Sequence, residues 1–246
     1  MGTGFLNDAA FAVRLADTAG RLLMDLRTCG LLEGQALGKA GDLTANAFLV
    51  ETIRANRPDD GLLSEESADD KLRCAMSRVW IIDPLDGTRE YSDGRTDWAV
   101  HVALAVDGKA VIGAVALPAL GLTLSTAAPL PLADANTPLR MLVSRTRPAA
   151  EAIAVAKILG ADLVSMGSAG AKAMAVVRGE ADIYLHTGGQ HEWDNCAPVA
   201  VALAAGLHVS RIDGSPLVYN CRSPYLPDLL ICRKELFAPV MAAMAA

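Results

Sequence analysis

The chain has 246 residues, of which 52% are hydrophobic, so it can form one large domain or two small ones around a substantial core. Its formal net charge is −6 and its pI is about 5.2. This balance argues against a general nucleic-acid-binding protein, which usually presents a basic face. A small phosphorylated ligand remains compatible, because local cations or metals can override the net charge.

Cysteine usage and hydropathy narrow the class further. The five cysteines are odd in number and include no Cys-x-x-Cys pair, which argues against a disulfide framework or a thiolate zinc site. The start of the chain carries Asp8 and Arg14, so we expect no secretion signal and a cytoplasmic location. Residues 110–133 lack charge, but prolines and glycines interrupt them, and we expect a buried hairpin there rather than a membrane span.

The first half of the chain predicts two helices and then several strands. Asn7 can cap a helix that runs to about Cys29. The glycines within 30–41 predict a mobile loop or hairpin, and a second helix is expected over 43–56, before Pro58. The expected strands cover residues 61–64, 79–82 and 98–106, followed by a hairpin after the Asp107-Gly108 turn.

The second half begins after a change in composition. Residues 127–138 are rich in Ala, Pro, Asn and Thr, and we place a boundary there between subdomains 1–132 and 133–246. Strands and helices alternate beyond it, which predicts an α/β layer. The expected strands cover 139–143, 163–166, 181–185 and 229–232, and the expected helices cover 149–159, 170–178, 195–205 and a segment from Lys234.

One hexad carries most of the chemical information. An apolar run leads to Asp83 and Asp86, which flank Pro84, and Gly87-Thr88 follows at once. This order predicts a strand, a turn and the start of a helix. Two carboxylates and free backbone N–H groups at a helix N-terminus suit Mg²⁺ and phosphate together. The hexad therefore makes the chain a candidate phosphatase.

Further ligands can be found for a second metal. Two metals roughly 3.5–4 Å apart can clamp both ends of an in-line displacement at phosphorus, and such a site needs about four carboxylates. Glu65 ends the preceding strand, so an adjacent strand would place it beside Asp83. The Leu85 carbonyl is a further possible ligand, and Asp194 opens a helix far downstream. Each acid taken alone also fits an ordinary cap, turn or solvated pair.

Together these segments resemble the inositol monophosphatase superfamily of Mg²⁺-dependent, lithium-sensitive phosphatases. Residues 83–88 look like its Asp-Pro-x-Asp-Gly-Thr signature, and the resemblance extends from Asp42 to Arg233. It implies a fold of the α+β or α/β class, namely the layered αβαβα architecture of the sugar phosphatases (inositol monophosphatase-like), with two subdomains. The companion motifs are Ser64-Glu65-Glu66-Ser67, Gly179-Glu180-Ala181-Asp182-Ile183-Tyr184 and Trp193-Asp194 with Ala197.

Within the superfamily, the chain looks closest to bisphosphate nucleotidases of the CysQ type, particularly actinobacterial forms. Three segments carry this likeness: 86–91, 144–147 and 167–172. The resemblance implies that the substrate is 3′-phosphoadenosine 5′-phosphate, which loses its 3′-phosphate to give AMP, and the sulfated nucleotide is a further candidate in sulfur assimilation. Inositol 1-phosphate, fructose 1,6-bisphosphate and histidinol phosphate are alternatives within the enzyme class. A non-catalytic regulator on the same fold is the alternative from another class.

The resemblance also implies a ligand set for two or three Mg²⁺ ions. Glu65, Asp83 and the Leu85 carbonyl would hold one ion, and Glu65 could contribute to a weaker third. Asp83, Asp86 and Asp194 would hold the second.

Catalytic roles are implied for Asp42, Glu65 and Thr88. Asp42 would pair with Thr88 and help to activate the attacking water. Asp42 could also cap a helix that starts at Leu43, and the two roles can coexist.

The phosphate that stays on the nucleotide needs cations to bind it. The candidates are Arg89, Arg145, Arg147 and Lys172, and the alternative for each is an ordinary surface charge. His101 is expected to be a core or hydrogen-bonded histidine. His186, His191 and Lys39 stand near the implied site without an assigned role. We expect a homodimer that binds a small phosphorylated nucleotide, with no nucleic-acid or membrane partner. The full set of implied substrate contacts is Asp86, Gly87, Thr88, Arg89, Arg145, Arg147, Ser168, Lys172 and Asp194.

Overall fold

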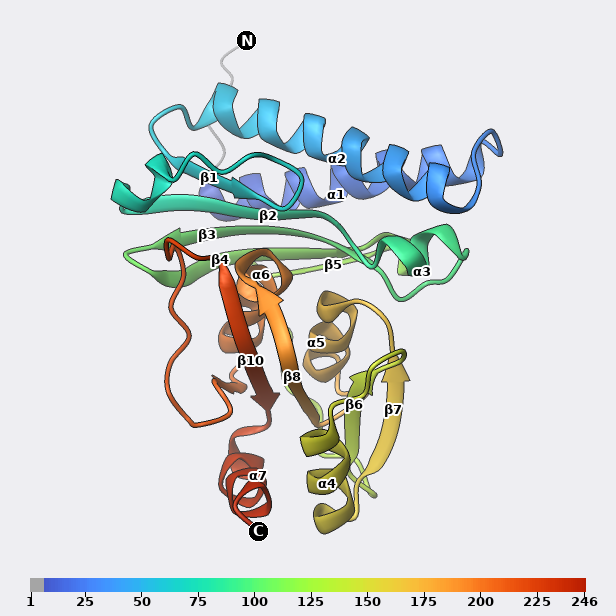
Figure 1. Ribbon diagram of the computed structural model, residues 1–246, viewed down its shortest axis with the longest axis vertical. Helices are drawn as coiled ribbons and strands as arrows, with labels where there is room; N and C mark the ends of the chain where they lie inside the picture. The colour runs from blue at the N-terminus through green and yellow to red at the C-terminus, as the bar shows by residue number, and fades with distance from the viewer. Residues whose placement is uncertain (1–6) are drawn as a thin grey trace.

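The computed structural model describes residues 7–246, which form five layers of alternating helices and sheets (Figure 1). Helices α1 and α2 cover one face of the first sheet, α5 and α6 lie between the two sheets, and α4 and α7 close the far side. The expected αβαβα architecture is confirmed. The helices are α1 (Asp8–Thr28), α2 (Gly34–Asn56), α3 (Thr88–Ser92), α4 (Ala150–Leu159), α5 (Ala169–Val177), α6 (Glu192–Ala204) and α7 (Phe237–Met244).

The first sheet has the order β1-β2-β3-β4-β5, and β1 and β2 are its parallel pair. The second sheet has the order β7-β6-β8-β10-β9. Its strands come from residues 140–232, whereas those of the first come from 61–125; a subdomain boundary at residue 132 stays a prediction. The strands are β1 (Gly61–Ser64), β2 (Arg78–Asp86), β3 (Ala99–Val106), β4 (Lys109–Leu117), β5 (Leu122–Ser125), β6 (Arg140–Ser144), β7 (Asp162–Met166), β8 (Ile183–His191), β9 (His208–Ser210) and β10 (Tyr225–Cys232).

Strand β2 lies between β1 and β3 in the first sheet and is buried on both faces. Because side chains alternate along a strand, Trp80 and Ile82 pack with α1 and α2, while Val79 and Ile81 pack into the core between the sheets. The pairing with β3 is irregular between Asp83 and Asp86, where Pro84 interrupts the ladder. The hexad therefore begins within the last residues of β2, where the pairing with β3 is irregular.

Helix α2 corrects one expectation. Residues 30–41 were expected to form a loop or hairpin, but they are helical from Gly34 onward. Helix α2 begins there, nine residues before the expected start at Leu43. A Cβ at Gly38 would lie 2.7 Å from the Ser92 Oγ, and one at Gly41 would lie 3.1 Å from the Leu85 side chain. These glycines favour close packing of α2 on α3 and the hexad, which outweighs their low helix propensity.

Most other expected elements are confirmed, with differences at their ends. Asn7 caps α1 through a hydrogen bond from the Ala10 N–H. Residues 110–133 contain β4 and β5 as a hairpin, and within residues 7–246 no helix has the length and apolar character that crossing a membrane requires. Strand β8 continues six residues beyond the expected end at Leu185, and β9 was not expected.

Candidate metal and phosphate site

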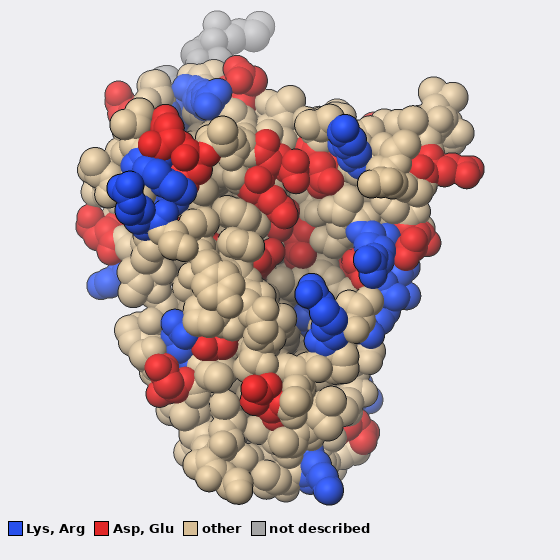
Figure 2. Space-filling model, in the orientation of Figure 1, with Lys and Arg blue, Asp and Glu red and all other residues tan. Residues whose placement is uncertain are grey.

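Four carboxylates meet where the first sheet faces the start of α6. The parallel register of β1 and β2 pairs Ser64 with Ile82, so Glu65 follows beside Asp83 as expected. Carboxylate oxygens of Asp83, Asp86 and Asp194 lie within 4.8 Å of one another. Figure 2 shows acidic side chains gathered at the upper centre of this face, with basic side chains on both its left and right sides. The structure thus brings together acids from both halves of the chain.

Asp86 is held more firmly than the other acids. Its Oδ2 accepts hydrogen bonds from the Ser168 hydroxyl at 2.5 Å and the Gly170 N–H at 2.6 Å. His101 Nε2 lies 3.2 Å from the same oxygen. Burial alone would raise the pKa of Asp86, but His101, Ser168 and Gly170 lower it to about 2. Within residues 7–246, the Oδ1 of Asp86 accepts one hydrogen bond, from the Ala169 N–H at 3.2 Å.

The remaining acids repel one another. Desolvation, together with the charges of Asp194 and Asp86, raises the pKa of Glu65 to about 7, although part of its side chain faces solvent. Desolvation also raises the pKa of Asp194 to about 6 and places that of Asp83 well above its usual range. A group of oxygen donors with mutually raised pKa values suits a hard divalent cation, which would replace the protons.

The Leu85 carbonyl is a further oxygen at this position. It accepts a hydrogen bond from the Thr88 hydroxyl at 3.2 Å, and the Asp83 side chain accepts one from the Leu85 N–H at 3.0 Å. The hexad is therefore tied to itself by its own side chains. Gly87, with φ of 91°, makes the turn that starts α3, and a Cβ there would lie 3.2 Å from Ser168 and Trp98.

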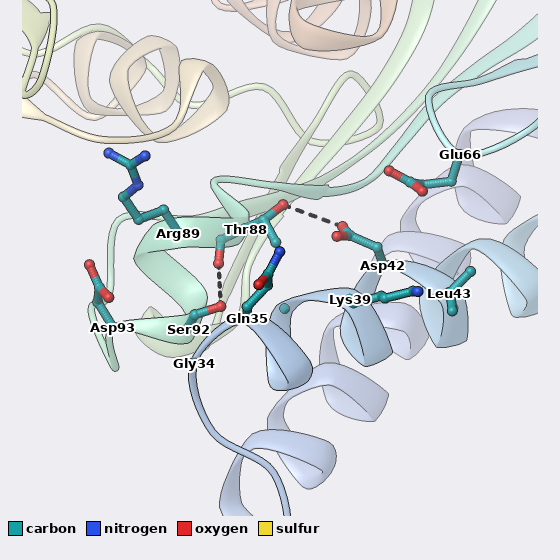
Figure 3. Close-up of a pocket in the computed structure, with 11 residues that line it drawn as sticks. Gly34, Gln35, Lys39, Asp42, Leu43, Glu66, Thr88, Arg89, Ser92 and Asp93 are labelled. Atoms are coloured by element: carbon teal, nitrogen blue, oxygen red, sulfur yellow. Dashed lines mark hydrogen bonds between the residues drawn. The ribbon is translucent and has the colours of Figure 1, made fainter.

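Asp42 and Thr88 lie together beside this cluster, as expected. The Thr88 Oγ1 is 3.4 Å from Asp42 Oδ1. Figure 3 shows the two side chains pointing toward each other from α2 and α3, on the wall of a cavity of about 610 Å³. Desolvation and the Glu66 charge raise the pKa of Asp42 to about 7. Asp42 lies inside α2 and not at its start, so the capping alternative is wrong.

Both the sequence and the fold of this chain match those of known proteins. A profile of the inositol monophosphatase family matches residues 7–241. The chain belongs to the inositol monophosphatase family. The structure agrees, since it superposes on the crystal structure of CysQ from Bacteroides thetaiotaomicron with a TM-score of 0.80, covering 95% of this chain and 99% of that one at 24% identity.

Three further proteins similar to this chain have names that specify an activity. The chain is 51% identical to a 3′-phosphoadenosine 5′-phosphate phosphatase of Mycobacterium leprae, over 96% of this chain and 92% of that protein. It is 32% identical to the 3′(2′),5′-bisphosphate nucleotidase CysQ of Escherichia coli K12, over 76% of this chain and 81% of that protein. An inositol monophosphatase from Zymomonas mobilis superposes with a TM-score of 0.80 at 21% identity, over 100% of both chains.

The predicted arginines fall into two groups in this family member. Arg89 and Arg147 are exposed and line one cavity of about 610 Å³ together with Thr88, Glu90 and Thr146. Arg145 is half-buried, and its Nη2 donates to Glu90 at 2.7 Å. Two guanidinium groups therefore line a cavity that also reaches the hexad, while the third already has a carboxylate partner.

Ser168 contacts Asp86 directly, and Lys172 contacts the backbone at Ser168. Lys172 is 5% exposed, and its ammonium group donates to the Ser168 carbonyl at 2.7 Å and to the Gly167 carbonyl. Burial lowers the pKa of Lys172 to about 8. Ser168 has a φ of 21° and donates to Asp86. This geometry favours a positioning role for Lys172 over the predicted contact with substrate.

Three residues without an assigned role are also located. Lys39 lines the cavity beside Asp42, and His191 is exposed and stacked 4.6 Å from Trp193. His186 is half-buried, and its Nε2 is 3.1 Å from the Gly189 carbonyl. The expected hydrogen-bonded character of His101 is confirmed by its Nδ1, which lies 2.9 Å from the Trp193 carbonyl. Sequence reasoning missed the approach of its Nε2 to Asp86, because that approach depends on the register of β2 against β3.

Proposed function

We propose that this protein is a Mg²⁺-dependent phosphatase that removes the 3′-phosphate of 3′-phosphoadenosine 5′-phosphate, giving AMP and inorganic phosphate. The observation that carries the proposal is the placement of the acidic cluster next to the cavity lined by Arg89 and Arg147. One part suits metal-assisted displacement at phosphorus, and the other suits a second phosphate that is retained. The names of the relatives that are 51% identical support the same substrate.

We assign the acids to two ions as the family resemblance implies. Glu65, Asp83 and the Leu85 carbonyl would hold one, and Asp83, Asp86 and Asp194 the other; a third ion at Glu65 is part of the proposal. Bound Mg²⁺ would neutralise charge on the phosphoryl group and acidify water. All of these donors are oxygens, which is the ligand type that Mg²⁺ prefers.

The protein's own groups then position the reaction. The Thr88 hydroxyl, between Asp42 and the Leu85 carbonyl, would orient the attacking water. The water oxygen would attack phosphorus as its proton passes toward the Asp42 carboxylate. The bond from phosphorus to the ribose 3′-oxygen would break, and that oxygen would take up a proton from water to leave as the 3′-hydroxyl of AMP. The raised pKa of Asp42, about 7, suits a group that accepts a proton near neutral pH.

Recognition of the nucleotide would use the cations beside the hexad. Arg89 and Arg147 are exposed, and within residues 7–246 neither guanidinium group has an ion-pair partner. Both can therefore form paired hydrogen bonds with the 5′-phosphate, because guanidinium groups match phosphate geometry. Gly87, Thr88 and Ser168 would lie near the departing phosphate. The sulfated nucleotide has the same 3′-phosphate and is a second candidate substrate in sulfur assimilation.

The proposal extends to the setting of the enzyme. We infer inhibition by lithium, a homodimeric state and a cytoplasmic location from the resemblance to the family. Size-exclusion chromatography with light scattering tests the dimer, and phosphate release with added Li⁺ tests the inhibition.

Product analysis tests the chemistry itself. Incubation of the nucleotide with enzyme and Mg²⁺ should give AMP, with phosphate that carries ¹⁸O from labelled water. Asp86→Asn removes one metal charge while keeping a similar shape, so this variant should be folded and inactive. Release of the 5′-phosphate instead, or full activity of Asp86→Asn, would contradict the proposal.

A further inference from the structure

His101 contacts both halves of the acidic cluster through a single imidazole. Its Nε2 lies 3.2 Å from Asp86 Oδ2, and its Nδ1 lies 2.9 Å from the Trp193 carbonyl. Trp193 immediately precedes Asp194 in the first turn of α6. The side chain of His101 is 0% exposed, so neither contact competes with bulk water. One buried ring thus connects an acid of the first sheet to the helix that carries an acid from the second half.

The surroundings of this ring show that its position is fixed. A carbonyl oxygen can only accept a hydrogen bond, so the Nδ1 of His101 carries a proton and donates to Trp193. A Cβ at Gly170 would lie 2.0 Å from His101 Nε2, so the ring fills the space that a side chain at position 170 would need. The Gly170 N–H meanwhile donates to the same Asp86 oxygen at 2.6 Å. Ring, glycine and carboxylate form one close-packed unit.

The connection matters because none of the other hydrogen bonds that the described residues make to these two acids joins Asp86 to α6. Besides His101, Asp86 is held by Ser168, Ala169 and Gly170 at the start of α5. Asp194 accepts from the His191 N–H, within its own helix start. His101 is therefore a direct link between the Asp86 side chain and the backbone that carries Asp194. Groups that hold a metal ligand in this way tune its geometry and its affinity for the ion.

We propose that His101 is a positioning residue that sets the spacing of Asp86 and Asp194 for the divalent cation. The inference rests on the metal site of the proposed function. It assigns to His101 no contact with substrate and no proton transfer. Its consequence is specific: loss of either contact should weaken cation binding while leaving substrate recognition and folding largely intact.

Two near-isosteric variants separate the two contacts. In His101→Asn, the amide nitrogen can take the place of Nδ1 and still donate to Trp193, but the contact with Asp86 is lost. In His101→Gln, the amide nitrogen can take the place of Nε2 and still reach Asp86, but the contact with Trp193 is lost. Gly170→Ala is a third variant, which displaces the ring without removing it. His208→Asn, on β9, is the matched control for replacing a histidine.

The measurement is binding of Mn²⁺ by electron paramagnetic resonance and of Mg²⁺ by calorimetry, on full-length protein without substrate. We expect each of the three variants to bind the cation about 10- to 100-fold more weakly. His208→Asn should bind as the wild type does. In phosphate-release assays, higher Mg²⁺ concentration should restore kcat in the variants, with KM for the nucleotide unchanged.

The possible outcomes are distinguishable. Wild-type affinity in a folded His101→Asn or His101→Gln variant would overturn the positioning role alone. Failure of the wild-type protein to bind either cation would overturn the proposed metal site, and this inference with it. If the histidine variants unfold, the melting temperature and cation affinity of Gly170→Ala decide, because that protein keeps the imidazole; wild-type affinity there overturns the proposal.

Discussion

The parallel pairing of β1 and β2 places Glu65 beside Asp83, and the Glu65 charge raises the pKa of the buried Asp83 carboxyl group. Two neighbouring carboxyl groups cannot both ionise freely, because each negative charge raises the pKa of the other group. The metal-free site therefore retains protons. The raised pKa values of Glu65, about 7, and Asp194, about 6, express this. The acidic cluster is thus unfavourable to folding by itself at neutral pH, and a cation relieves it.

Asp194→Asn should reveal this cost in metal-free protein. The pKa of Asp194 is raised from 3.8 to about 6, so the native state holds more protons than the unfolded state within that interval. Stability therefore falls as pH rises through it, by at most about 3 kcal/mol. The uncharged amide of the variant has no such dependence. In EDTA, the melting temperature of the variant should rise relative to wild type between about pH 4.5 and pH 7.

The reverse trend in that comparison would contradict the assignment. Added Mg²⁺ provides the matched test, because the cation binds the deprotonated acids. It should raise the melting temperature of the wild-type protein more at neutral than at acidic pH, and should have less effect on Asp194→Asn.

Gly38→Ala should perturb catalysis through a steric contact. The added Cβ would lie 2.8 Å from Thr88 Cγ2 and 2.7 Å from Ser92 Oγ, so the side chains of Thr88 and Ser92 must shift. Such overpacking destabilises by about 1–3 kcal/mol and should lower kcat by displacing Thr88 from Asp42. Adding Thr88→Ser removes Cγ2 but keeps the hydroxyl, so kcat should partly recover. A Gly38→Ala enzyme with unchanged kcat would argue against the Asp42–Thr88 pair.

Arg147→Ala should discriminate between substrates with one and two phosphates. Loss of a charged hydrogen bond to the retained phosphate should raise KM for the bisphosphate by roughly 10-fold or more, since such bonds contribute about 1.5–3 kcal/mol. Inositol 1-phosphate has no second phosphate, so its kinetics should not change. Arg54→Ala is the matched control, because Arg54 is exposed on α2 and pairs with Glu51 at 3.6 Å. Equal losses on both substrates would place Arg147 elsewhere in the reaction.

Lys172→Met should act on the metal site through Ser168. The methionine keeps the length and apolar packing of the side chain but removes the donors to the Gly167 and Ser168 carbonyls. We expect weaker Mg²⁺ binding and a lower melting temperature, with KM for the nucleotide little changed at saturating Mg²⁺. A large rise in KM alone would instead restore the direct substrate contact that the sequence suggested.

Sequence reasoning succeeded where one local pattern decides a structure. The Asp107-Gly108 pair does form the turn between β3 and β4, with positive φ at both residues. The apolar run before Asp83 is a doubly buried strand, and its neighbour β1 places Glu65 as expected. The proximity of Asp194 to the hexad was expected from the family resemblance alone.

It failed where tertiary packing overrides a local preference. The glycines at 38 and 41 weaken a helix in isolation, but the close approach of Ser92 and Leu85 requires them within one. The burial of Lys172 depends on how α5 packs between the two sheets, and the contact of His101 with Asp86 depends on the register of β2 against β3. No spacing along the chain encodes such contacts, so these residues could be located only in three dimensions.

The central claim is that this site hydrolyses the 3′-phosphate of a nucleotide bisphosphate. The most direct measurement is kcat/KM for 3′-phosphoadenosine 5′-phosphate, inositol 1-phosphate and fructose 1,6-bisphosphate with one enzyme preparation at saturating Mg²⁺. We expect kcat/KM for the nucleotide to exceed that for either of the other two substrates by about 100-fold or more, because they cannot satisfy the same polar contacts. A value for either sugar phosphate equal to or above that of the nucleotide would contradict it.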